Sequence, residues 1–134
     1  MTAQPGRRSG FRKTGVLFAL LWMGLIFFLS AQPDLPHPQS GWLDLLFSSA
    51  AHMFMFGVLA VLWAWALGQG RYGWLVALAL TLLYALSDEF HQSFVPGRHA
   101  DPADLVCDAL GALVGLAAWA WLRRWRRHPL QHPG

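Results

Sequence analysis

Four long apolar runs, separated by short polar stretches, constrain this chain more than any other feature. Each run is close to the roughly 20 residues that a helix needs to cross about 30 Å of hydrocarbon. Backbone polar groups in hydrocarbon must be satisfied internally, and no alternating pattern of barrel strands is present. The sequence therefore predicts an all-α, polytopic membrane protein with four transmembrane helices in a small bundle. The predicted spans are residues 14–31, 46–67, 72–87 and 103–122.

The composition excludes the common soluble classes. Of 134 residues, 55% are apolar and 13% are charged, and the charged share is about half that of an ordinary soluble domain. Eight Trp and nine Phe stand against a single lysine, Lys13, and a single glutamate, Glu89. Basic residues concentrate at the chain ends rather than along a binding face, which argues against a nucleic-acid partner. Cys107 is the only cysteine, so no intramolecular disulfide can form.

The basic residues also predict an orientation. Nine of the ten lie in the tail 1–13, the turn 68–71 and the tail 123–134, which share one side if all four segments span. The seven acidic residues and Arg98 fall on the other side. The positive-inside rule then places both termini in the cytoplasm, with residues 14–122 as the membrane domain. Cleavage of the first span as a signal peptide is the alternative, and it is disfavoured because Phe28 and Leu29 occupy the positions that require small residues.

Ionisable residues gather at the outer ends of the last three spans. At roughly 1.5 Å of rise per residue, His52, Asp88 and Asp108 lie roughly 22 to 25 Å from the cytoplasmic ends of their helices. Charged groups at that level normally face the bundle interior or a water-filled cavity. We therefore expect one outward-facing polar site. On the last helix one face carries Asp104, Asp108, Gly111 and Gly115, of which the two glycines form a small-xxx-small packing motif.

The polar segment resembles the signature of VanZ-like membrane proteins. The run from Asp88 to Arg98 matches its E-x-x-Q-x-F-x-P-G-R pattern, and the acid pair and glycines of the last helix follow as in the family. His52 matches a family histidine, and the resemblance covers residues 30–116. The chain departs from the pattern where the family commonly has lysine, tyrosine and asparagine, at Ser49, Phe56 and Asp108 respectively.

The resemblance implies a small multi-pass protein of the bacterial inner membrane and cell envelope, in a family named for an accessory protein of glycopeptide resistance. Two classes of function remain open. The first is a non-enzymatic protein whose pocket binds an envelope lipid head group, a lipid-linked wall precursor or another membrane protein. The second is a metal-assisted enzyme acting on a lipid-linked, phosphate-containing substrate, with a divalent cation held by Glu89, Asp104, Asp108 and His52. No intact metalloenzyme motif is present, which favours the first class. The candidate ligand-binding residues are His52, Asp88, Glu89, Gln92, Arg98, Asp104 and Asp108.

Overall fold

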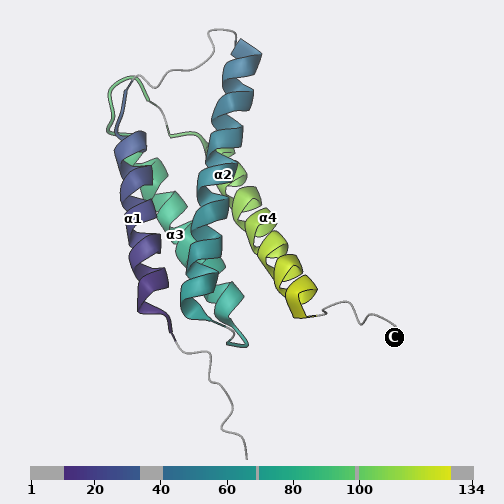
Figure 1. Ribbon diagram of the computed structural model, residues 1–134. Helices are drawn as coiled ribbons and strands as arrows, with labels where there is room; N and C mark the ends of the chain where they lie inside the picture. Colours follow the sequence, from purple (N-terminus) through teal and green to yellow (C-terminus); the bar gives the residue numbers. More distant parts are fainter. Residues whose placement is uncertain (1–10, 34–40, 69, 99, 128–134) are drawn as a thin grey trace, which may run out of the picture.

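Four helices make up the regular structure of the described chain (Figure 1). The structure is a computed structural model that describes residues 11–33, 41–68, 70–98 and 100–127. All four helices are long and apolar enough to cross a membrane, which confirms the predicted fold class. Three are longer than the spans that hydropathy marks: the second at its start, and the third and fourth at their ends. The helices are α1 Lys13–Ser30, α2 Gly41–Leu67, α3 Gly73–Gln92 and α4 Pro102–Arg127.

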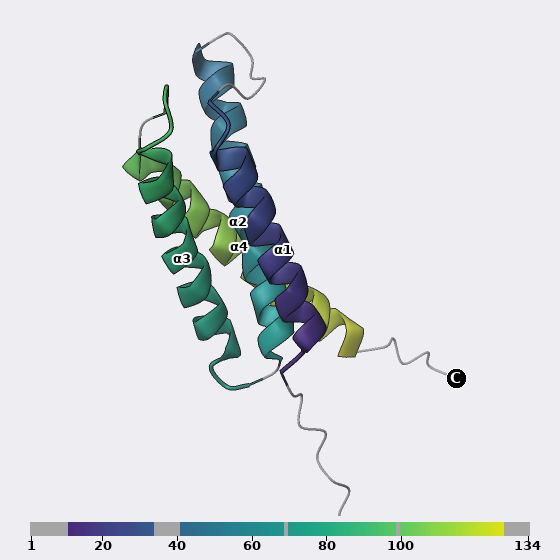
Figure 2. The same ribbon diagram turned by 90° about the vertical axis from the view of Figure 1, so that its left-hand side faces the viewer.

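The two ends of the bundle carry different side chains. The start of α1, the turn from α2 to α3 and the end of α4 lie together at one end (Figure 1). We call this the basic end, because Arg12, Arg71 and Arg123 belong to it. The end of α1, the end of α3 and the start of α4 lie at the opposite end, which we call the polar end (Figure 2). The first turns of α2 extend beyond the polar end (Figure 1).

Helix α2 is the centre of the bundle and contacts each of the other three helices. Its closest neighbour is α4, which crosses it at three glycines. A Cβ added to Gly111 would lie 2.6 Å from the Cα of Met53, and one added to Gly115 would lie 2.5 Å from the carbonyl oxygen of Gly57. The predicted small-xxx-small pair therefore packs backbone against backbone, as in other membrane helix pairs.

The core between the helices is thin, and most large apolar side chains face outward. Phe56 and Leu59 of α2 are buried together with small residues such as Ala19 and Ala85. Many leucine and phenylalanine side chains on all four helices are exposed, as expected for a surface that contacts lipid. Two hydrogen bonds brace the interior: Trp22 Nε1 donates to the carbonyl of Met55 at 2.9 Å, and Tyr84 Oη donates to the carbonyl of Met23 at 2.6 Å.

Candidate functional site at the polar end

Helical periodicity brings four residues of α3 to its inner face. Ala85, Asp88, Glu89 and Gln92 follow the i, i+3, i+4, i+7 spacing, and all four are buried. The structure thus buries Asp88, Glu89 and Gln92 together on this face. His91 lies to the side, where its ring packs against Phe27 of α1 with centroids 4.3 Å apart.

His52 of α2 pairs with two carboxylates of α4. Its Nδ1 lies 2.9 Å from Oδ1 of Asp108, and its Nε2 lies 3.8 Å from Oδ2 of Asp104. The side chain of Asp108 is fully buried, while that of Asp104 is 21% exposed and that of His52 is 13% exposed. The two acids share a helix face with Gly111, so the close crossing of α2 and α4 sets them beside His52.

Glu89 of α3 completes this group. The side chain is buried, and its Oε2 accepts a 3.0 Å hydrogen bond from the backbone N–H of Asp101 at the start of α4. One potential ligand atom from each of His52, Glu89 and Asp108 lies within 4.8 Å of the others. We call His52, Glu89, Asp104 and Asp108 the histidine cluster.

Asp88 anchors a second buried group beside the histidine cluster. Its Oδ2 accepts hydrogen bonds from Ser30 Oγ of α1 at 2.8 Å and from Gln92 Nε2 at 3.1 Å. Asp88 is close enough to His52 and Asp108 to interact with both electrostatically. Gln92 is thus engaged inside the protein, so a ligand would have to compete with Asp88 for its amide.

Three buried carboxylate oxygens have no hydrogen-bond partner among the described residues. They are Oδ1 of Asp88, Oε1 of Glu89 and Oδ2 of Asp108. Buried polar atoms in proteins normally have a partner, and an unsatisfied buried charge is costly. Two of these oxygens, on Glu89 and Asp108, belong to the histidine cluster and are therefore available to bind a cation.

Arg98 lies in the loop between α3 and α4 and is partly exposed. Within the described residues it forms no ion pair with a carboxylate, although it is the one basic residue predicted on the same side as the acids. Its backbone N–H donates to the carbonyl of Val95 in the turn that contains Gly97, whose φ is +81°. Arg98 therefore lies in the loop at the polar end and forms no part of the buried cluster.

Asp101 caps the start of α4. Asp101 Oδ1 accepts a 2.8 Å hydrogen bond from the N–H of Ala103, and Pro102 is the first helical residue. Because capping already accounts for Asp101, that residue is not needed in the histidine cluster. Its N–H instead fixes Glu89 in place.

Sequence reasoning missed two residues that shape this site. Ser30, the last residue of α1, donates the hydrogen bond that links this helix to Asp88. Gly57 supplies the α2 side of the helix crossing. In the sequence, Ser30 is simply a small polar residue at the end of the first span, and this does not specify its partner.

Comparison with known proteins gives one match. A family model described as VanZ/LLP1 matches residues 15–123, which include most of each of the four helices. No curated protein matches the chain, and no solved structure does. The family match covers every residue of the histidine cluster.

Proposed function

The chain belongs to the VanZ/LLP1 family of multi-pass membrane proteins, and from this premise we propose that its polar site binds the phosphate-bearing head group of an envelope lipid or lipid-linked wall precursor through a divalent cation. The proposed location is the bacterial inner membrane, with the polar end outside and both termini in the cytoplasm. Binding rather than turnover is the proposed activity.

The observation that carries the proposal is the convergence of His52, Glu89 and Asp108, with one potential ligand atom of each within 4.8 Å of the others. Glu89 and Asp108 are at least nine-tenths buried, and each has an oxygen without a partner among the described residues. Carboxylates concentrated at low dielectric attract a cation strongly. Carboxylate oxygens and imidazole nitrogen are together suitable donors for divalent metals such as Mn²⁺ and Zn²⁺.

The hydrogen bond between His52 and Asp108 supports a role for His52 as one of the ligands. With a carboxylate at Asp108, the imidazole Nδ1 is the donor, which in the neutral ring leaves the lone pair on Nε2. That nitrogen lies 3.8 Å from Oδ2 of Asp104, another acceptor. Two acceptors this close favour a hydrogen-bond donor or a cation nearby. A carboxylate that orients a histidine in this way is a common companion of metal ligation.

The cation explains how an acidic site can take a phosphate. Without it, the carboxylates would repel a phosphate oxygen. A bound divalent ion reverses the local charge, and the partly exposed Asp104 marks the side from which a ligand can approach. Arg98, at the same end, supplies a second positive group for the phosphate.

The segregation of charge supports the proposed orientation. The described basic residues other than Arg98 lie at the basic end, and cytoplasmic loops of membrane proteins carry an excess of arginine and lysine. The polar end would then face the compartment where wall precursors are used. An effect on envelope properties, including susceptibility to glycopeptide antibiotics, is part of this proposal.

Metal and lipid binding by the purified full-length chain test the function. We expect about one Mn²⁺ or Zn²⁺ per chain by elemental analysis after dialysis, and binding of a polyprenyl phosphate that EDTA abolishes. Asp108→Asn should lose both. Asp101→Asn is the matched control, because it removes one charge nearby while keeping the side-chain oxygen that caps α4. Absence of stoichiometric metal in the intact protein, or an equal loss in the control, would overturn the proposal.

A metal-assisted enzyme is the second candidate, and one observation favours it. The side chain of Asp104 is more exposed than those of its neighbours His52 and Asp108. It lies beside Nε2 of His52, where a carboxylate could act as a general base next to the metal. Release of inorganic phosphate from a polyprenyl diphosphate by the metal-loaded protein would support it. That release should disappear in Asp104→Asn while metal binding persists, whereas binding without release supports the first function.

A further inference from the structure

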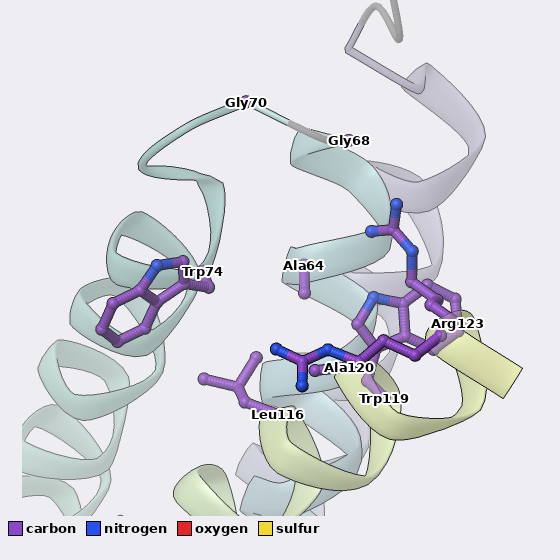
Figure 3. Close-up of a pocket in the computed structure, with 9 residues that line it drawn as sticks. Ala64, Gly68, Gly70, Trp74, Leu116, Trp119, Ala120 and Arg123 are labelled. Atoms are coloured by element: carbon purple, nitrogen blue, oxygen red, sulfur yellow. The ribbon is translucent and has the colours of Figure 1, made fainter. Parts of the chain in front are cut away.

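A pocket of about 300 Å³ opens at the basic end, between the diverging end of α4 and helices α2 and α3. Figure 3 shows Trp74 of α3 on one side and Leu116, Ala120 and Arg123 of α4 on the other, with Ala64 of α2 between them. The pocket exists because α4 touches α2 at the glycine crossing and leans away below it (Figure 1).

The lining combines three kinds of group. Small and aliphatic residues, Ala64 and Leu116 among them, form an apolar floor. Two tryptophans, Trp74 and Trp119, form the walls, and tryptophan is enriched at the level of lipid head groups. Arg123 and Arg124 lie at the rim. Basic pockets between transmembrane helices are a known mode of binding for anionic lipid head groups.

We propose that this pocket binds one anionic phospholipid, with its phosphate at Arg123 and Arg124 and the upper part of one acyl chain between Trp74 and Leu116. Charge complementarity selects this occupant. The described acidic side chains belong to the polar end, so the basic end carries a net positive charge. An apolar floor in a pocket that two arginines also line fits a lipid rather than a free phosphate, which would leave the floor uncovered.

The arginines are positioned by the helix itself. The guanidinium of Arg123 lies over the ring of Trp119, 5.8 Å from its centroid, which restrains it at the pocket wall. Arg124 follows directly and is exposed. This lipid site lies at the opposite end of the bundle from the histidine cluster. The two proposals are therefore independent, and failure of one leaves the other unchanged.

Native mass spectrometry of the full-length chain in detergent tests the site. Phosphatidylglycerol and phosphatidylcholine with identical acyl chains would be titrated separately, with inorganic phosphate as a competitor. We expect one phosphatidylglycerol to bind roughly tenfold or more tightly than phosphatidylcholine, and phosphate not to displace it. Equal affinity for the two lipids would overturn the proposal, and displacement by phosphate would indicate an anion site without a lipid.

Two double variants test whether the lipid binds in this pocket or is only attracted to the positive charge of the basic end. Arg123→Gln with Arg124→Gln should weaken phosphatidylglycerol binding roughly tenfold or more. Arg71→Gln with Arg126→Gln removes the same charge at the same end from two exposed residues outside the lining, and should leave affinity nearly unchanged. An equal loss in both double variants would overturn the site.

One variant tests the pocket without changing charge. Ala120→Leu fills part of the cleft and should weaken the same lipid. Because Ala120 is an exposed residue of α4, this variant should still fold. It therefore tests the lipid site even if the double arginine variant fails to fold. Unchanged affinity in a folded Ala120→Leu protein would overturn the placement of the acyl chain.

Discussion

The hydroxyl of Ser30 donates a 2.8 Å hydrogen bond to Oδ2 of Asp88, which joins the last residue of α1 to α3. Both side chains are buried, and this is one of two hydrogen bonds that the oxygen accepts from side chains. A buried carboxylate that loses a donor bears the full cost of desolvation. The contact therefore ties the first span to the polar site.

Ser30→Ala should lower the free energy of unfolding by about 1 to 3 kcal/mol, because one buried acceptor loses a donor. Thermal or denaturant unfolding in detergent, followed by circular dichroism, measures the change. Ser87→Ala is the matched control, since the hydroxyl of Ser87 is exposed and bonds within its own helix to the carbonyl of Tyr84. Equal effects of the two substitutions would contradict a special role for Ser30.

Gly111→Ala should disrupt the crossing of α2 and α4, because the new methyl group would collide with the backbone of Met53. We expect a loss of about 1 to 3 kcal/mol, typical of overpacking, and weaker metal binding at the adjacent Asp108. Gly24→Ala provides the comparison, since no atom lies within 4 Å of its added Cβ. Melting curves and metal titrations of both proteins check the prediction, which is wrong if Gly111→Ala retains wild-type values in both.

Tyr84→Phe should remove the bond from α3 to the carbonyl of Met23 in α1 while keeping the ring in the core. The expected destabilisation is about 1 kcal/mol, the usual net contribution of such a hydrogen bond. Tyr72→Phe serves as the reference, because Tyr72 is 59% exposed. Unfolding of the two variants under identical detergent conditions separates them, and a neutral Tyr84→Phe would show that the bond contributes nothing.

The orientation predicts where intact cells can be labelled. In a Cys107→Ser background, a cysteine at Ala100 should react with a membrane-impermeant maleimide, whereas one at Gly70 should react only after permeabilisation. Both positions are exposed, and they lie at opposite ends of the bundle. Labelling of position 70 from outside would reverse the topology.

The number of spans and the convergence of His52, Asp104 and Asp108 were predictable, because both follow from periodicity and depth along a helix. The ends of the helices were less predictable from the sequence. Trp42 and Leu45 precede residue 46, where the second span was predicted to begin, yet they belong to the first turns of α2.

Pairings across helices could not be predicted. Which residue of α1 meets Asp88 depends on how both helices are rotated about their axes, and exposed apolar residues surround each helix, so no single face is marked. Gly57 carried no signal because its neighbours at four-residue spacing, Met53 and Val61, are large. The polar site was therefore predictable as a set of residues but not as a network.

The glycine crossing has an evolutionary consequence. Asp108 lies one helical turn before Gly111, and His52 immediately precedes Met53, the residue whose backbone Gly111 meets. The register of the polar side chains is thus specified by main-chain contact rather than by their own chemistry. A relative could exchange the carboxylates for other ligands and inherit the same scaffold, whereas a relative that enlarged the glycines would lose the alignment whatever side chains it kept.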